Sequence, residues 1–141
     1  MREYLFKGKR LDNGEWIEGD LSQDRDLGKA YIHGYDYYTD ECGLQREPFE
    51  FEVDPETVGQ FTGMMDGDGK KTFEGDVLSY SNPKPFRDFI AVVSFNDGCF
   101  DLVNDSRDYR DYLKCHTCNY TGNVIGNRWD NPELLEGVGG T

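Results

Sequence analysis

The sequence predicts an all-β protein with a minor α component, built from two small β units. Its 141 residues include 9 Tyr, 9 Phe and 2 Trp against 3 Met, and large aromatic side chains are typical of β-rich cores. Short stretches of strand character recur along the chain, separated by turns rich in its 17 glycines. A helical spacing of apolar residues occurs once. The combination indicates small β-sandwiches or barrels.

We expect residues 1–60 to form the N-terminal unit, which opens with a hairpin over residues 1–21. The Asp-Asn-Gly turn at residues 12–14 supplies the positive φ that a tight hairpin turn needs. Gly19 lies inside the second strand of this hairpin. A glycine at such a position indicates a bulge or a close approach of another backbone.

The rest of the N-terminal unit combines extended and turn-like segments. Residues 29–38 are Tyr-rich and extended in character, and residues 39–47 read as a polar turn region. Residues 49–53 (FEFEV) alternate apolar and acidic side chains, which predicts a strand with one buried face. Pro55 predicts a turn or the first turn of a short helix.

We expect residues 61–130 to form the C-terminal unit, a five-stranded SH3-like barrel or strongly bent sheet. Two Asp-Gly pairs at residues 66–69 predict a hairpin tip. Residues 89–95 (FIAVVSF) are a strong strand candidate, and the Asn-Asp-Gly turn at 96–98 predicts an antiparallel return over residues 99–103.

One helix is predicted, over residues 104–114. Ser106 is a suitable N-cap, and Tyr109, Tyr112 and Leu113 follow at spacings of three and four residues, on one face of a helix.

The chain is expected to close with a strand over residues 123–129. Residues 131–141 should then form a turn or single helical turn followed by a flexible tail. We expect the two units to make one compact structural domain.

The composition excludes several classes of partner. The chain has 28 acidic and 15 basic residues, a net charge of −13, and no basic cluster that could track a phosphate backbone or an anionic membrane. No stretch resembles a signal peptide or a membrane span, so we expect a soluble cytoplasmic protein. The acidity itself has two interpretations, mimicry of nucleic acid or simple solubility, and the second is favoured.

Two stretches of the chain are alike. GKRLDNGEWIEGDL at residues 8–21 and GMMDGDGKKTFEGDV at residues 63–77 each run from a glycine through a polar hairpin tip to Glu-Gly-Asp. We interpret each as a hairpin followed by a redirected strand. The pairs Glu18/Asp20 and Glu74/Asp76 would also suit acid–base or metal chemistry, but local turn hydrogen bonding is favoured.

The cysteines raise the question of zinc. Cys115 and Cys118 have CxxC spacing with His116 between them, but no second ligand pair follows. The other candidates, Cys42, Cys99 and His33, are scattered along the chain. A redox role for the CxxC pair is also open, while ordinary thiols, reduced in the cytoplasm and without disulfides, are the favoured interpretation.

An acidic loop raises the question of calcium. Asp66, Asp68, Glu74 and Asp76 could supply oxygen ligands. The spacing departs from an EF-hand loop, which needs an acidic residue where Lys70 stands and a Glu where Val77 stands. We therefore expect a hairpin tip without calcium.

Several blocks of the sequence, in order, resemble the YopX-like proteins of phages and prophages. They are MREYLFKGKRLDNGEWIEGDL, DPETVGQFTGMMDGDGKKTFEGDVL, VVSFNDGCFDL and NVIGNRWDNPELLEG. The resemblance implies a β-rich fold, a phage or prophage origin, self-association and no assigned biochemical activity. Residues 22–50 and 104–122 match no block, so we expect protein-specific properties there.

The sequence predicts a non-catalytic module for protein–protein interaction or self-assembly, with no catalytic residue, metal or cofactor. A homo-oligomer is the expected state, with a host or phage protein as a further possible partner. Two other functions stay open. One is an acidic decoy that inhibits a basic nucleic-acid-binding protein, and the other is a metal-dependent enzyme using the carboxylate-rich turns.

Overall fold

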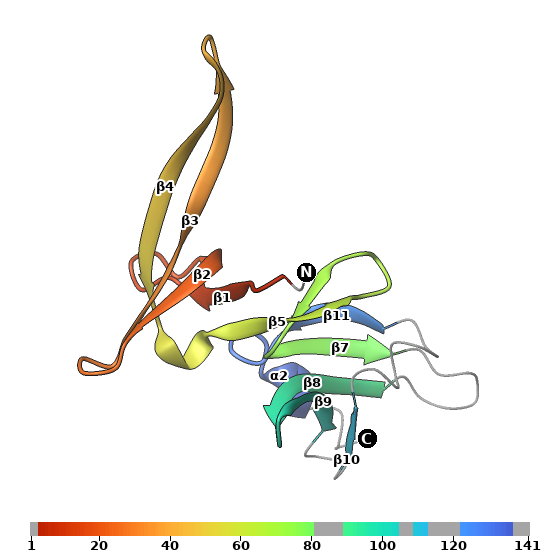
Figure 1. Ribbon diagram of the computed structural model, residues 1–141. Helices are drawn as coiled ribbons and strands as arrows, with labels where there is room; N and C mark the ends of the chain where they lie inside the picture. Colours follow the sequence, from red (N-terminus) through yellow and green to blue (C-terminus); the bar gives the residue numbers. More distant parts are fainter. Residues whose placement is uncertain (1–2, 81–88, 105–108, 113–121, 137–141) are drawn as a thin grey trace. The chain divides into compact units, whose positions relative to one another are not determined.

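The computed structural model describes residues 3–80, 89–104, 109–112 and 122–136 (Figure 1). In these ranges antiparallel strands dominate the fold, accompanied by one short α-helix and one 3₁₀ helix, which confirms the all-β class predicted from the sequence. The chain divides into two compact units, residues 1–60 and residues 61–141. No helix of the described ranges is long and apolar enough to cross a lipid bilayer.

The first unit is an antiparallel sheet in the order β4-β3-β2-β1. Its elements are β1 (Phe6–Lys9), β2 (Trp16–Asp24), β3 (Lys29–Asp40), β4 (Gly43–Val53) and the 3₁₀ helix η1 (Pro55–Thr57). The predicted hairpin at the start of the chain is therefore confirmed, as is the short helical turn at Pro55. β1 also pairs with the beginning of β5 (Gly59–Met65).

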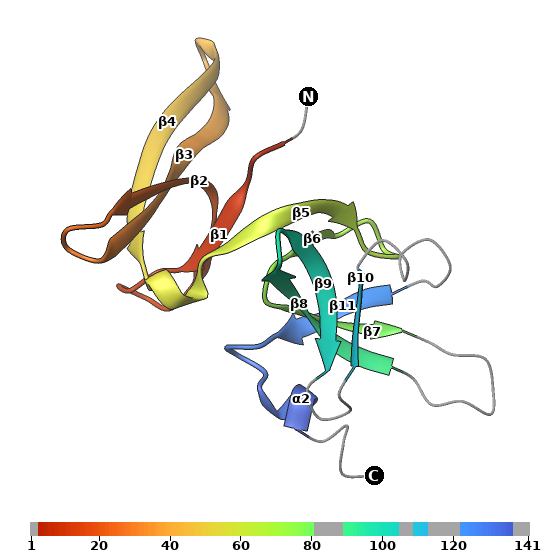
Figure 2. The same cartoon turned by 60° about the horizontal axis from the view of Figure 1, so that its bottom comes forward.

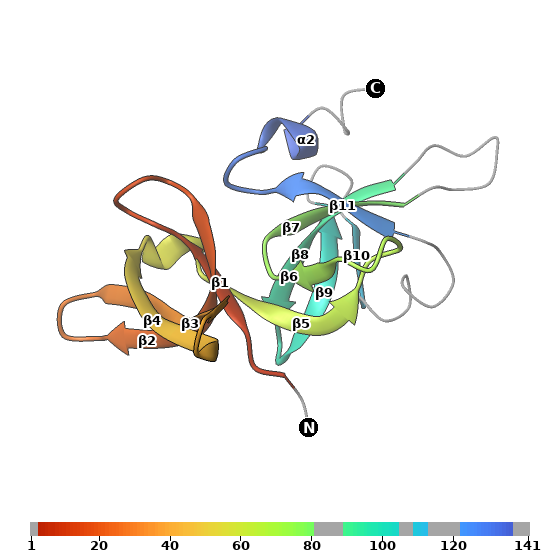
Figure 3. The same cartoon turned by 90° about the horizontal axis from the view of Figure 1, so that it is seen from above.

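This sheet curls, so that its two ends approach each other (Figure 3). Arg10, just after β1, forms an isolated antiparallel bridge with Val53 at the end of β4. The core of this unit consists of Ala30, Ile32 and Val53. Val53 lies so close to Gly8 that a Cβ at Gly8 would be 2.9 Å from a Val53 methyl group.

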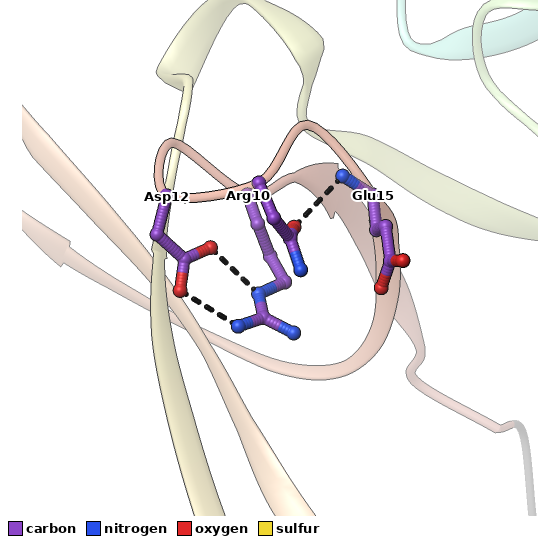
Figure 4. A network of polar contacts seen from close by, with 4 residues as sticks. Arg10, Asp12 and Glu15 are labelled. Carbon is purple, nitrogen blue, oxygen red and sulfur yellow. Dashed lines mark hydrogen bonds and ion pairs between the residues drawn. The ribbon is translucent and has the colours of Figure 1, made fainter.

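The turn between β1 and β2 is held by Arg10 (Figure 4). Its guanidinium donates two hydrogen bonds to the Asp12 carboxylate, at 2.9 and 2.7 Å, and its Cζ lies 3.6 Å from the centre of the Phe51 ring. The hydrogen bond from Arg10 lowers the pKa of Asp12 below its ordinary value despite partial desolvation. Arg10 thereby links this turn to β4.

The second unit contains a five-stranded antiparallel sheet in the order β10-β9-β8-β7-β11 (Figure 2). Its strands are β7 (Asp76–Tyr80), β8 (Phe89–Asn96), β9 (Cys99–Asn104), β10 (Tyr109–Tyr112) and β11 (Gly122–Asn127). The remainder of β5 pairs with β6 (Lys71–Phe73), and α2 (Glu133–Glu136) ends the described chain. The core contains Leu78, Tyr80, Ala91, Val93 and Leu102. Within the described residues this sheet does not close into a barrel. It agrees with the prediction of a barrel or bent sheet through the second of these two forms.

The β8–β9 hairpin follows its sequence signal closely. Asn96 pairs with Cys99, and the two residues between them, Asp97 and Gly98, have φ values of 52° and 81°. Positive φ at both central residues defines a type I′ turn, whose twist matches that of the flanking strands. The predicted strands at 89–95 and 99–103 are confirmed.

The predicted helix over residues 104–114 is wrong. Where this segment is described, it is the end of β9 and the strand β10, with Tyr109 opposite Asn104 and Tyr112 opposite Asp101. Tyr is among the residues that favour strands, and β9 offers a free edge for pairing. The pairing of β10 with β9 therefore outweighed the weak preference for a helix that three residues at helical spacing had indicated.

The predicted polar turn over residues 39–47 is also wrong in its extent. β3 runs to Asp40 and β4 starts at Gly43, so the turn consists of Glu41 and Cys42. Gly43, with φ of 102°, supplies the positive φ at the end of the turn. The polar residues 45–47 were mistaken for a loop because neither face of this part of the two strands is buried.

The two copies of Glu-Gly-Asp have different structures. In β2, residues 16–19 pair with β1, and the pairing with β3 begins at Asp20. A Cβ at Gly19 would clash with the His33 carbonyl oxygen, so the predicted close backbone approach is confirmed. Gly75 instead makes a turn between β6 and β7, with φ of 93°. Asp76 accepts a hydrogen bond from the Phe73 N–H at 2.8 Å.

Candidate functional site

The β3–β4 hairpin extends far beyond the sheet that carries it (Figure 1). β2 pairs with β3 from His33 back to Lys29, whereas β3 and β4 pair with each other along their whole length. Residues 34–49 therefore form a two-stranded ribbon without a third strand, which we call the arm. Isolated two-stranded ribbons are marginally stable in water. The arm is thus the part of the first unit that a packing partner would stabilise most.

The two faces of the arm differ sharply in charge. In-register residues share a face, and successive residues alternate between faces. We call one the Tyr35 face, made by Tyr35, Tyr37, Thr39, Leu44, Arg46 and Pro48. The other, the Tyr38 face, carries Asp36, Tyr38, Asp40 and Glu47. The Tyr35 face thus holds no carboxylate in a chain whose net charge is −13.

The Tyr35 face exposes large apolar side chains. Tyr37 and Leu44 have exposed fractions of 65% and 72%, and Tyr35 is also exposed. The one charged side chain, Arg46, lies over Tyr35, with its Cζ 4.2 Å from the ring centre. Contiguous exposed apolar surface of this kind marks interaction sites in soluble proteins.

The outer edge of the arm is unsuited to strand addition. β4 is the last strand in the order of the sheet, and Pro48 lies near its middle. Proline has no N–H to donate, and within sheets it is confined to edge positions that face solvent. Charged neighbours such as Glu47 and Glu50 further discourage edge pairing. The β4 edge of the arm is therefore unfavourable for pairing with another strand.

A recess adjoins the Tyr35 face where the arm joins the sheet. It has a volume of about 510 Å³, and its lining includes Asp20, Ser22, His33, Tyr35, Pro48 and Glu50. Asp20, His33 and Glu50 are directly opposite one another on β2, β3 and β4, and form one row across the sheet. Ser22 Oγ and His33 Nε2 share a hydrogen bond of 2.9 Å. The recess is therefore acidic, with an aromatic wall.

The two carboxylate pairs considered as catalytic groups, Glu18/Asp20 and Glu74/Asp76, lie in different surroundings. Asp20 is exposed in the recess with Glu18 two residues away on β2, whereas Asp76 is buried in the second unit and accepts the Phe73 N–H. Asp76 thus performs the local turn hydrogen bonding that was favoured. Among the described residues no group of His, Cys, Asp and Glu is arranged to hold a metal ion.

The proposed calcium loop is a hairpin tip held by Asp66. Its Oδ1 accepts the N–H groups of Asp68 and Lys70 at 2.9 and 2.8 Å, and its Oδ2 accepts the Val124 N–H at 3.1 Å. Burial raises the pKa of Asp66, but these three donors and the Lys70 charge outweigh it and hold the pKa below the ordinary 3.8. A carboxylate saturated by backbone donors is a structural anchor.

The cysteine candidates can be placed only in part. Cys115, His116 and Cys118 lie outside the described residues. Cys42 is exposed in the turn at the tip of the arm, and Cys99 Sγ is 3.4 Å from the Asn96 carbonyl oxygen that accepts its hydrogen bond. His33 lines the recess, next to Tyr35.

Sequence reasoning missed the arm. The signal was present, because tyrosines at 31, 35 and 37 recur with period two and Arg46, Pro48 and Glu50 follow the same period. The strand assignment stopped at residue 38 because the polar residues 39–47 were read as a turn. The arm lies in the segment 22–50, which contains none of the sequence blocks that resemble the YopX-like proteins.

Comparisons with known proteins agree with this architecture. Protein EF1440 from Enterococcus faecalis, known from a crystal structure, superimposes with a TM-score of 0.63 at 22% identity, covering 96% of this chain and 99% of that chain. At this identity the likeness shows a shared fold. No curated protein matches the chain. The model of the YopX protein family matches residues 5–136. The chain therefore belongs to the YopX family.

Proposed function

We propose that the protein is a non-catalytic module that associates with a second copy of itself through the Tyr35 face of the arm. One observation carries the proposal. A two-stranded ribbon, unsupported by a third strand, presents an apolar face from which every carboxylate is absent. The proposal takes the protein to be phage- or prophage-encoded and to act in the bacterial cytoplasm.

The energetics of the arm favour a packing partner. Ordering a backbone costs roughly 1–2 kcal/mol per residue, and the residues of the arm recover little of this by burial. Burying a large apolar side chain returns about 1.5–3 kcal/mol. Tyr35, Tyr37 and Leu44 are 48%, 65% and 72% exposed, so covering all three would supply about twice that amount.

A second copy is the occupant that fits the charges. Two chains of net charge −13 repel, so an interface between them must keep carboxylates away from one another. The Tyr35 face meets this requirement because Asp36, Asp40 and Glu47 lie on the opposite face. Packing face to face would bury the tyrosines of both copies and leave the acidic faces in water.

Adjacent tyrosines on opposite faces provide a matched test. Tyr37→Asp places a carboxylate in the proposed interface, whereas Tyr38→Asp makes the same chemical change on the other face. Sedimentation velocity over a range of concentrations should show the wild type and Y38D associating and Y37D monomeric. A wild type that stays monomeric at every concentration would overturn self-association and leave the arm to a host or phage protein. If Y37D and Y38D associate equally, the Tyr35 face is not the interface.

A further inference from the structure

The Tyr35 face and the recess carry opposite charges that find no partner within the described chain. Arg46 forms no ion pair among the described residues, and neither do Asp20 and Glu50 in the recess. Arg46 is also the single Lys or Arg between residues 30 and 53. One cation and two carboxylates therefore lie exposed on the same face of the sheet, Asp20 on β2 and Arg46 and Glu50 on β4.

We infer that the recess is a guanidinium-binding site and that it receives Arg46 from a second copy. This inference rests on the proposed self-association and specifies its geometry. Arg46 and Glu50 lie on the same face of β4, at equal distances on either side of Pro48. Along a strand this separation is about 13 Å.

A twofold axis makes the contact reciprocal. If the axis lies in the interface, at right angles to β4 and level with Pro48, it places Arg46 of each copy opposite Glu50 of the other. Tyr37, the cross-strand neighbour of Arg46, then faces His33, the neighbour of Glu50. Face-to-face strand layers pack about 10 Å apart, a gap that an arginine side chain spans.

The recess has the chemistry that a guanidinium requires. Asp20 and Glu50 offer carboxylate oxygens that can accept its planar fork of N–H donors. Tyr35 provides a flat ring on which the guanidinium can stack, as Arg46 already does on Tyr35 of its own chain. Phe49 adds a second aromatic ring to the lining. Lysine, a point charge without a planar fork, would fit less well.

Charge reversal on both sides of the contact tests the inference. Arg46→Glu should weaken association by about 100-fold, because a carboxylate then faces Glu50 and Asp20. Glu50→Arg alone should weaken it similarly by opposing Arg46. The double variant R46E/E50R should recover most of the affinity, since each new Glu then faces a new Arg. Sedimentation equilibrium of the full-length variants measures each constant.

Glu47→Arg is the control, because it makes the same charge change as E50R on the Tyr38 face of the same strand. It should leave association unchanged or slightly stronger.

Arg46→Lys keeps the charge but loses the planar fork of donors, so it should weaken association by about 10-fold. If Arg46→Glu disturbs folding, Arg46→Gln replaces it as the variant that removes the guanidinium. Far-UV circular dichroism checks that each variant is folded.

The outcomes distinguish a failure of the guanidinium site from a failure of the proposed self-association. A monomeric wild type refutes the proposed function. A wild type that associates while R46E associates equally well refutes the guanidinium site alone. Failure of the double reversal to recover affinity, with both single variants weakened, would also overturn the reciprocal pairing of Arg46 with Glu50.

Discussion

At the scale of single residues, side chains that resemble ligands act mainly as structural anchors. Asp66 and Asp76 belong to the acidic loop of the second unit, and both accept hydrogen bonds from backbone N–H groups. The sequence could show that carboxylates and glycines alternate here. It could not show that the N–H groups of Lys70 and Val124 already occupy the Asp66 oxygens.

Asp66→Asn should destabilise the second unit by about 1–3 kcal/mol, the cost of weakening hydrogen bonds to a charged acceptor. Asp68→Asn is the control, because it makes the same chemical change at an exposed residue two positions away. Urea unfolding measures the difference, and exchange of the Val124 amide should quicken in D66N alone. Unchanged Val124 exchange would contradict the anchoring role.

The effect of Asp66 should also depend on pH. Because the pKa of Asp66 in the folded protein is below its ordinary value of 3.8, its stabilisation is fully present above that value. The stabilisation is lost as the pH falls through the folded pKa. The difference in unfolding free energy between wild type and D66N should therefore be constant near neutral pH and shrink below about pH 4. A difference that persists at pH 2 would count against this.

Gly75→Ala should be among the most damaging single changes. Gly75 has φ of 93°, and a Cβ there would overlap the Trp129 ring. Gly43 has φ of 102°, and a Cβ there would meet nothing within 4 Å, so Gly43→Ala isolates the backbone strain. We expect G43A to lower the free energy of unfolding by about 1–3 kcal/mol and G75A to lower it by clearly more. Equal losses in thermal unfolding would show that Trp129 moves aside freely.

At the scale of elements, hairpins with a strong turn signal could be predicted, and pairings between distant segments could not. The Asn-Asp-Gly turn and its strands were predicted because the turn conformation and the alternation are local. β10 was mistaken for a helix because its pairing with β9, which defines it, is tertiary. The recess was unpredictable for the same reason, since Asp20, His33 and Glu50 meet only through strand register.

The arm should gain protection when the protein associates. Its amides, at residues 34–49, are hydrogen-bonded within two strands and have little buried side-chain surface around them. Hydrogen exchange followed by mass spectrometry should show these amides exchanging faster than those of β8 in dilute protein, and slowing as concentration rises. In Y37D the concentration dependence should vanish. Arm protection that is the same at all concentrations would contradict association through the arm.

At the scale of the whole molecule, charge sets the conditions of assembly. The 13-unit excess of acidic over basic residues acts between copies over roughly a Debye length, about 10 Å in 0.1 M salt. The contact proposed at Arg46 would be local and attractive, whereas the repulsion between the remaining charges would be long-ranged. Net repulsion therefore dominates at low salt.

Self-association should accordingly strengthen as salt is raised from about 10 mM to about 150 mM, because screening removes the long-range repulsion first. Sedimentation velocity across this range measures the trend. An acidic decoy that captures a basic protein would show the reverse, with binding that weakens steeply as salt increases. Y37D, which lacks the proposed contact, should remain monomeric throughout and serves as the control.

The sequence by itself determined the β class, the tight turns and the resemblance to the YopX family, because strand alternation, positive-φ glycines and ordered sequence blocks are all local patterns. The tertiary structure decided which strands pair, and so turned the supposed polar turn at 39–47 into an arm with one face free of carboxylates. It also decided that Glu-Gly-Asp continues a strand at Gly19 and makes a turn at Gly75. The reason is that pairing between distant strands depends on register and burial, which residues acquire only from neighbours remote in the chain.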